Sequence, residues 1–135
     1  MTIVILDKSI TVRTKIVDLL ENIDFNSFDI NEFEDAELAY DFIRDNSVDL
    51  IISSIETDGM DGVDFVELLL GNNPDLVSRL FIITSQKDSE HILEIKDIGA
   101  KRFIRKPINE ETFNHFIIPE IKKILQTKNS LFWDR

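Results

Sequence analysis

The 135-residue sequence contains no cysteine, which excludes disulfide bonds, thiolate metal sites and a cysteine nucleophile. It also has no apolar run near the roughly 20 residues that a membrane-spanning helix requires. The apolar opening, residues 1–6, is too short and wrongly flanked for a signal peptide. These absences predict a soluble, cytoplasmic protein that does not contact a membrane.

Basic residues are scarce relative to acidic ones: 15 Lys and Arg stand against 26 Asp and Glu, for a net charge of -11. This excess of negative charge disfavours nucleic acid and anionic lipid as partners. Glycine is also scarce, and the stretch Asp7-Lys8-Ser9, which follows the first apolar segment, contains none. That absence argues against the glycine-rich phosphate loops of flavin and dinucleotide proteins.

Apolar segments of strand length alternate with segments whose apolar residues recur at helical spacing. We expect strands over 2–6, 28–33, 50–52, 80–83 and 103–104, with helices over 63–70 and 89–98 and others beginning after Ser9, Asp35 and Asn109. Five such strand–helix units predict an α/β domain with a mainly parallel sheet and helices on both faces. The polar–apolar alternation of 28–33 predicts a half-exposed edge strand. Pro119 is expected to kink the last helix or split it in two.

The length fits one domain, which we place over residues 1–127, followed by a C-terminal tail over 128–135. The tail holds the apolar cluster Leu131-Phe132-Trp133, with the only tryptophan of the chain. Packing of this cluster on its own domain is the favoured interpretation. A docking peptide for a partner and the start of a dimerising helix are the alternatives. We expect a monomer or a weak homodimer.

Polar residues stand where four of the predicted strands end. Asp7-Lys8 follows the first strand, Ser54 the third, Thr84 the fourth and Lys106-Pro107 the fifth. In open α/β sheets, ligands bind and chemistry occurs at the carboxyl ends of the strands. We therefore expect the functional site at this edge.

These residues, together with the G-M-D-G of 59–62, resemble the receiver domain of bacterial two-component response regulators, of the kind found in chemotaxis regulators. Asp49 and Ser54 stand in the spacing of the family's D-x-x-x-x-D, and residues 99–107 resemble its G-A-x-x-[FY]-x-x-K-P. The resemblance extends from Ile3 to about Leu125. It implies a flavodoxin-like doubly wound (βα)5 three-layer sandwich, with a parallel five-stranded sheet of order 2-1-3-4-5.

In that family, two acidic residues after the first strand and an aspartate ending the third hold magnesium, and the aspartate accepts a phosphoryl group from a histidine kinase. A Thr or Ser after the fourth strand and a Lys after the fifth then bind the phosphate. By this resemblance, Asp7, Thr84, Lys106 and Pro107 match the family. Phe103 occupies its aromatic switch position.

This sequence departs from the family at the residues that carry out phosphoryl transfer and bind the metal. Ser54 stands at the phosphoacceptor position, and Lys8 replaces the second acidic residue. A serine hydroxyl needs a base to become a nucleophile, and a lysine offers only donors and cannot ligate a hard cation. The charges of Asp7, Lys8 and Lys106 sum to +1, or to 0 when Glu56 is added. The sequence therefore predicts a degenerate pocket, a magnesium site that is lost or very weak, and no other metal or cofactor.

Individual side chains in this pocket also invite predictions. We expect Lys106 to pair with Asp7, and Lys8 to reach Glu56 or Asp7 and so replace the charge of the metal. Glu56 and Asp58 are poor substitute acceptors because they lie on the loop beyond the strand end, out of register with Thr84 and Lys106. His91 and His115 are expected on the protein surface, away from Ser54. That placement argues against a hydrolase.

The leading hypothesis is a non-enzymatic receiver that is not phosphorylated on aspartate and acts as a protein-interaction module. By the resemblance, its partner surface comprises the fourth helix, fifth strand and fifth helix, roughly Ser89 to Leu125. The partner is a histidine kinase or another signalling protein. The alternative is a regulatory domain that binds an anion or phosphorylated metabolite through Ser54, Thr84, Lys8 and Lys106.

Overall fold

The structure is a computed structural model that describes residues 1–23, 28–85 and 88–133, with side chains described as far as residue 127. The strands are β1 (Thr2–Leu6), β2 (Asp29–Phe33), β3 (Leu50–Ser54), β4 (Leu80–Thr84) and β5 (Arg102–Arg105). The helices are α1 (Ile10–Glu21), α2 (Ala36–Asp45), α3 (Gly62–Asn72), α4 (Ser89–Ile98), α5 (Glu110–Phe116) and α6 (Ile118–Trp133), with a 3-10 helix η1 (Pro74–Arg79).

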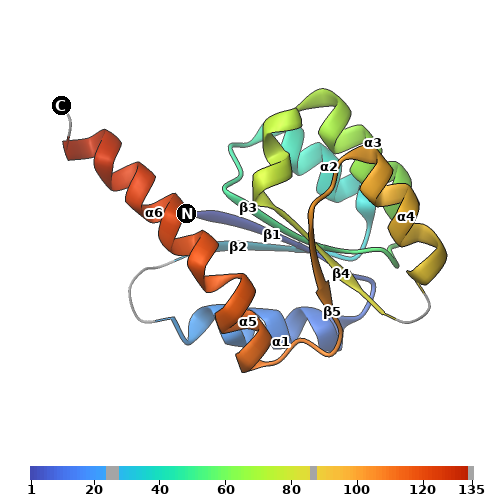
Figure 1. Cartoon of the computed structure of the whole chain (residues 1–135), viewed down its shortest axis with the longest axis horizontal. Helices are drawn as coiled ribbons and strands as arrows, with labels where there is room; N and C mark the ends of the chain where they lie inside the picture. Colours follow the sequence, from blue (N-terminus) through green and yellow to red (C-terminus); the bar gives the residue numbers. More distant parts are fainter. Residues whose placement is uncertain (24–27, 86–87, 134–135) are drawn as a thin grey trace.

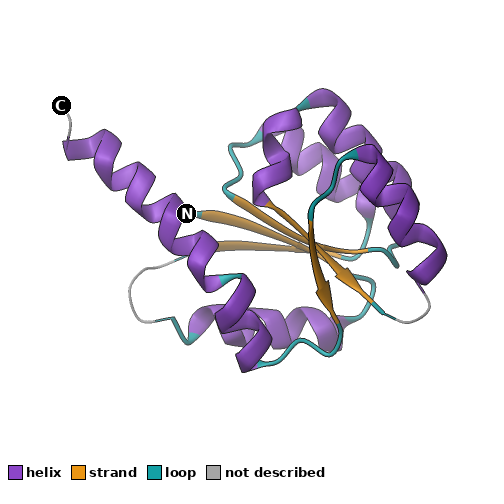
Figure 2. Ribbon diagram, in the orientation of Figure 1, coloured by secondary structure: helices purple, strands orange, loops and turns teal. Residues whose placement is uncertain are grey.

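The five strands form one parallel sheet in the order β2-β1-β3-β4-β5. Helices α2, α3 and α4 cover one face, whereas α1, α5 and the first part of α6 cover the other (Figures 1 and 2). The predicted three-layer flavodoxin-like fold and its strand order are confirmed.

Two apolar cores lie on the two sides of the sheet. Val4 and Leu6 of β1 face the α2–α3–α4 side, while Ile3 and Ile5 face the α1–α5–α6 side. Strands β3 and β4 are likewise buried on both faces, which explains their continuous apolar runs. Strand β2 lies at one edge of the sheet and is only partly buried, as its alternation predicts.

Local signals in the sequence set several helix boundaries. The side chains of Ser9 and Asp35 accept hydrogen bonds from main-chain N–H groups at the starts of α1 and α2, and Asn109 forms a capping box with Thr112. Pro119 is the second residue of α6, where a missing N–H costs no helical hydrogen bond. The predicted split of the last helix is therefore confirmed.

Helix α6 continues to Trp133 and so runs across the boundary proposed at residue 127. It extends from the body of the domain towards the C-terminus (Figure 1). The side chains of Leu131, Phe132 and Trp133 lie outside those described, so the packing of the tail remains a prediction. Within the described ranges, no helix is both long and apolar enough to cross a membrane.

Candidate functional site

Asp7 and Lys106 meet at the carboxyl edge of the sheet. The Asp7 carboxylate is buried, and its Oδ1 accepts a hydrogen bond of 2.8 Å from the Ser9 N–H. Lys106 Nζ lies 3.3 Å from Oδ2 without the geometry of a hydrogen bond, so the contact is an ion pair. This pair confirms the predicted partner of Lys106. The following peptide bond, Lys106–Pro107, is cis.

Ser54 and Thr84 end the neighbouring strands β3 and β4, and both are buried. The ladder pairs Ser54 with Ile83, which places Thr84 one residue further along the adjacent strand. The main-chain N–H of Lys106 donates to the Thr84 carbonyl at 2.7 Å, so the end of β5 is fixed beside the end of β4. The fold thus brings Asp7, Ser54, Thr84 and Lys106 to one edge.

The prediction for Lys8 is wrong. Its Nζ lies 3.7 Å from Oδ1 of Asp58, rather than beside Glu56 or Asp7, and both paired side chains are about half exposed or more. Lys8 does contact Glu56, but through the main chain: its N–H donates to the Glu56 carbonyl at 3.3 Å. The loop after β3 folds back towards β2, which carries Asp58 to the place where the lysine side chain ends.

Main-chain hydrogen bonds impose that path on the β3–α3 loop. The N–H of Asp58 donates to the Glu34 carbonyl at 3.0 Å, and the Asp58 carbonyl accepts from the Ala36 N–H at 2.9 Å. With the Lys8–Glu56 bond, these contacts join the loops that follow β1, β2 and β3. We call this set of three bonds the three-loop brace.

Each of the two glycines in the G-M-D-G stretch is required at its position for a different steric reason. Gly59 has φ of +76°, a conformation that strongly favours glycine. A Cβ on Gly62 would collide with the carbonyl oxygen of Ile55, so the start of α3 can approach the end of β3 only without a side chain there. Asp61 then caps α3 by accepting a 2.7 Å hydrogen bond from the Val63 N–H.

A hollow of about 420 Å³ adjoins this edge and is lined by Lys8, Ile55, Glu56, Thr57, Asp61, Gly62, Asp88 and His91. Sequence reasoning missed Asp88, which is buried and accepts from the N–H and hydroxyl of Ser85 at 2.6 and 3.1 Å. Its position just before α4 suggests an N-cap, but its carboxylate makes no capping hydrogen bond to that helix and accepts from Ser85 instead. His91 is partly exposed, and its Nδ1 lies 3.8 Å from Oε1 of Glu94.

The chemistry available at this edge is limited by contacts within the chain. Lys8 and Lys106 each face a carboxylate, and Asp61 and Asp88 already accept main-chain hydrogen bonds. The described residues include no cluster of three or more His, Asp or Glu side chains suited to a metal ion. The Ser54 carbonyl accepts a 3.0 Å hydrogen bond from the Ser53 hydroxyl, and within those residues no hydrogen bond joins the Ser54 hydroxyl to a carboxylate or imidazole base.

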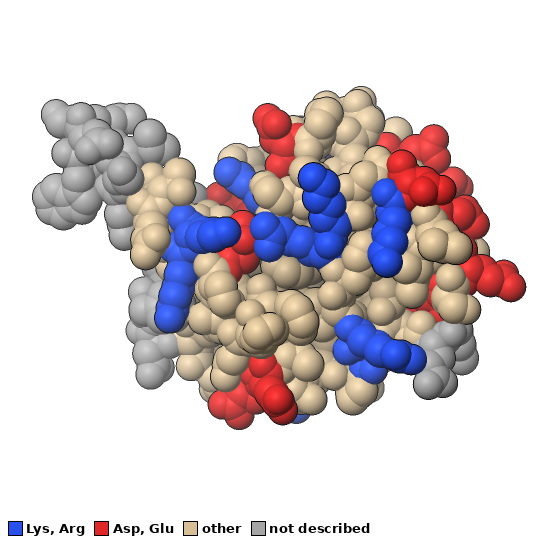
Figure 3. Space-filling model, in the orientation of Figure 1, with Lys and Arg blue, Asp and Glu red and all other residues tan. Residues whose placement is uncertain are grey.

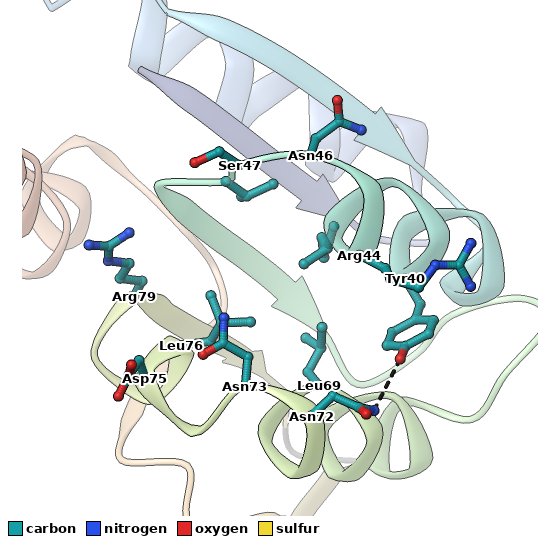
Figure 4. Close-up of a pocket in the computed structure, with 12 residues that line it drawn as sticks. Tyr40, Arg44, Asn46, Ser47, Leu69, Asn72, Asn73, Asp75, Leu76 and Arg79 are labelled. Carbon is teal, nitrogen blue, oxygen red and sulfur yellow. Dashed lines mark hydrogen bonds between the residues drawn. The ribbon is translucent and has the colours of Figure 1, made fainter.

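A second hollow, of about 500 Å³, lies at the opposite end of the strands, between α2, α3 and η1 (Figure 4). The Asn72 side-chain amide donates to the Tyr40 hydroxyl at 3.0 Å across one end. Arg44 on its rim binds both carboxylate oxygens of Asp45, and this hydrogen bonding lowers the pKa of Asp45 and raises that of Arg44. The guanidinium is therefore already engaged within the chain.

Phe103 lies apart from both hollows, on β5. Its ring packs, partly buried, against the core on the α4 side, and Lys96 Nζ lies 5.4 Å from the ring centroid. This distance is typical of a cation–π contact. The aromatic side chain therefore belongs to the surface between α4 and β5.

Comparisons with known proteins agree with this geometry. The sequence profile described as response regulator receiver domain matches residues 3–118. Chemotaxis protein CheY-3 of Vibrio cholerae is 25% identical over 112 residues, which cover 83% of this chain and 85% of that protein. A cyclic di-GMP phosphodiesterase of Thermotoga maritima is 30% identical over 86 residues. The match covers 64% of this chain but only 22% of the phosphodiesterase.

Solved structures share the fold. The chemotaxis response regulator CheY4 of Vibrio cholerae superposes with a TM-score of 0.71 at 21% identity, covering 91% of this chain and 97% of that one. The signal receiver domain of a modulated diguanylate cyclase from Desulfovibrio desulfuricans G20 gives a TM-score of 0.74 at 22% identity, with 93% and 97% covered. The profile match spans most of the chain and agrees with the observed strand order; the chain belongs to the response regulator receiver domain family.

Proposed function

We propose that this receiver domain works in two-component signalling without phosphorylation on aspartate, as a protein-interaction module and not as an enzyme. The observation that carries the proposal is the set of internal partners at the carboxyl edge. Ser54 stands at the expected acceptor position, and both nearby lysines face carboxylates of the same chain. An edge arranged in this way has no carboxylate at Ser54 to form an acyl phosphate.

The residues present do not fit a magnesium ion. Magnesium prefers several oxygen ligands in near-octahedral geometry. Asp7 faces the Ser9 N–H and the Lys106 ammonium, while the Glu56 carbonyl accepts from the Lys8 N–H. The position beside Asp7, where the resemblance expects a second carboxylate, holds a cation. We therefore propose that the magnesium site is lost or very weak.

The alternative function, binding of an anion or phosphorylated metabolite, is not favoured by these contacts. Lys8 and Lys106 would have to leave Asp58 and Asp7 to bind an anion. Ser54 and Thr84 are both buried, so their hydroxyls offer little surface to a ligand.

The output of such a module passes through another protein. Receiver domains interact with signalling proteins such as kinases, and we propose that this one uses the region from Ser89 to Leu125. A cytoplasmic location remains a prediction, as does the monomeric or weakly dimeric state.

The test is phosphoryl transfer from acetyl phosphate with Mg²⁺, followed by intact mass and amide NMR, with beryllium fluoride as a phosphate mimic. We expect no adduct and no shifts around Ser54, Thr84 and Lys106. The matched control is the double variant Lys8→Asp and Ser54→Asp, which restores both missing carboxylates and should gain Mg²⁺-dependent labelling.

Two outcomes would contradict the proposal. An adduct on the unaltered chain would mean that another carboxylate, such as Glu56 or Asp58, accepts the phosphoryl group. A double variant that folds but stays unlabelled would mean that these two substitutions are not what removes the chemistry.

A further inference from the structure

Charge is unevenly distributed along this acidic chain. Residues 96–123 hold seven of the 15 Lys and Arg but only four of the 26 Asp and Glu, so this segment is basic within a protein of net charge -11. It includes the end of α4, all of β5 and the start of α6. Figure 3, in the orientation of Figure 1, shows Lys and Arg side chains gathered across the face where β5 crosses the front of the molecule.

Five residues of α4, β5 and the loop between them form one surface, which we call the α4–β5 surface: Leu93, Lys96, Lys101, Phe103 and Arg105. Lys96 lies over the Phe103 ring. Arg105 is two residues from Phe103 on β5 and so points to the same side of the sheet. Leu93 precedes Lys96 by three residues on α4, which places the two on neighbouring parts of one helix face.

The cations of this surface are exposed and are not engaged within the described part of the chain. No ion pair among the described residues includes Lys96, Lys101 or Arg105. Arg102, on the same strand, differs because it is half-buried and binds the buried carboxylate of Glu120 at 3.1 Å. Arg102 therefore fixes α6 to β5, whereas its neighbours face solvent.

The α4–β5 surface also exposes apolar side chains. Leu93 is 68% exposed, although it is a large aliphatic side chain, and Phe103 is only partly buried beneath Lys96. Of the acidic residues of α4, Glu94 lies on the side of the helix turned away from Lys96 at 100° per residue. Two carboxylates of α4 border this surface at Leu93: Glu90 lies three residues before it and Asp97 four residues after it.

We propose that the α4–β5 surface binds an acidic segment of a signalling protein, a segment that also carries an apolar side chain. This inference rests on the proposed function and specifies the chemistry of its partner. The partner's carboxylates pair with Lys96, Lys101 and Arg105, and its apolar side chain covers Leu93 and the exposed edge of Phe103. Complementary charge supplies orientation and association rate, and the apolar contact supplies affinity.

A protein segment fits this surface better than a nucleic acid or a membrane. The rest of the chain is strongly acidic and repels a long polyanion or an anionic bilayer over a Debye length of about 8 Å at physiological salt. A short acidic segment contacts only the basic surface. An exposed leucine beside a partly covered aromatic ring suits a side chain of a protein and offers nothing to a phosphate backbone.

The experiment titrates the full chain with a synthetic peptide that alternates Glu and Asp around one Leu and one Phe, observed by amide NMR. A control peptide has Gln and Asn in place of the acids. The test variant is Lys101→Glu with Arg105→Glu. The control variant is Lys15→Glu, which reverses an exposed charge on α1, away from this surface. Duplex DNA and phosphatidylserine vesicles are tested in parallel.

The expected result is a set of shifts between residues 93 and 105 with the acidic peptide, weaker binding of the amide peptide, and an affinity about tenfold lower in the double variant. Lys15→Glu should bind as the unaltered chain does. Absence of these shifts, equal losses in both variants, or tighter binding of DNA or vesicles at the same residues would overturn the inference.

The two proposals fail separately. A phosphoryl adduct contradicts the phosphorylation-independent function and leaves the peptide result unaffected. Failure of the peptide to bind contradicts the partner chemistry and leaves the absence of phosphoryl transfer unaffected.

Discussion

The carboxyl edge of the sheet and the α4–β5 surface use the same kinds of side chain in opposite ways. At the carboxyl edge, Lys106 and Lys8 face Asp7 and Asp58 of the same chain. On the α4–β5 surface, Lys96, Lys101 and Arg105 are exposed and face no carboxylate in an ion pair of the described residues. The lysine that faces the buried Asp7 helps to hold the domain together, the exposed Lys8 pair contributes little to stability, and an unpaired lysine remains available to another molecule.

The two regions also differ in how much their charged side chains contribute to stability, because they differ in burial. The Asp7 side chain is 2% exposed, so its charge needs a partner inside the fold. Charges that are fully hydrated need none, and removing them changes stability little. Substitutions that break the Asp7–Lys106 pair should therefore be detected in unfolding experiments, and substitutions on the α4–β5 surface in binding experiments.

The largest expected effect is that of Gly62→Ala at the start of α3. Because the added Cβ meets the Ile55 carbonyl, the helix must move, and we expect the free energy of unfolding to fall by about 3 kcal/mol. Gly71→Ala is the matched control, since nothing lies within 4 Å of its Cβ in the same helix. It should raise stability by about 0.5 kcal/mol or more. Urea denaturation measures both, and a neutral Gly62→Ala would contradict the close packing.

The next effect is that of Lys106→Met. This change leaves the Asp7 carboxylate buried without its cation and should lower the free energy of unfolding by about 2 kcal/mol, a value reduced by the partial exposure of the lysine. Adding Asp7→Asn removes the stranded charge and should recover part of the loss. A double variant less stable than either single variant would show that the ion pair is not the relevant contact.

The smallest expected effect on stability is that of the double reversal Lys101→Glu and Arg105→Glu. Both side chains are exposed and unpaired in the described structure, so the midpoint of urea unfolding should correspond to a change of at most about 0.5 kcal/mol. Binding of the acidic peptide should still fall about tenfold. If instead stability falls by more than about 1.5 kcal/mol, these residues hold the fold, and the contrast between the two regions is lost.

The fold was predictable from local patterns because those patterns express burial. Continuous apolar runs at 50–52 and 80–83 correspond to strands buried on both faces, and the alternation at 28–33 corresponds to an edge strand. Pro119 divides the last helix because proline has no N–H to donate, which is unfavourable in the interior of a helix but harmless in its first turn. Helix α5 therefore ends at Phe116, and Pro119 is the second residue of α6. The 3-10 helix over Pro74–Arg79 was missed, since the Gly-Asn-Asn-Pro signal indicates only where a helix ends.

The site was predictable in its positions and less so in its contacts. Strand ends fix where Asp7, Ser54 and Thr84 lie, and the Lys106–Asp7 pair follows from that register. The partner of Lys8 did not follow, because the path of the β3–α3 loop depends on main-chain bonds from Asp58 to the loop after β2. No periodicity in the sequence encodes those bonds.

The three-loop brace has a consequence for the timescale of local opening. Its N–H donors, Lys8, Ala36 and Asp58, belong to segments that would exchange their hydrogens rapidly if they were ordinary surface loops. Here each donates to a carbonyl of a different loop, so one amide cannot be released unless two segments separate. The carboxyl edge should therefore exchange with deuterium as a single slow unit, in step with the strands beneath it. Resistance to such opening makes the edge a fixed platform and leaves switching to other parts of the molecule.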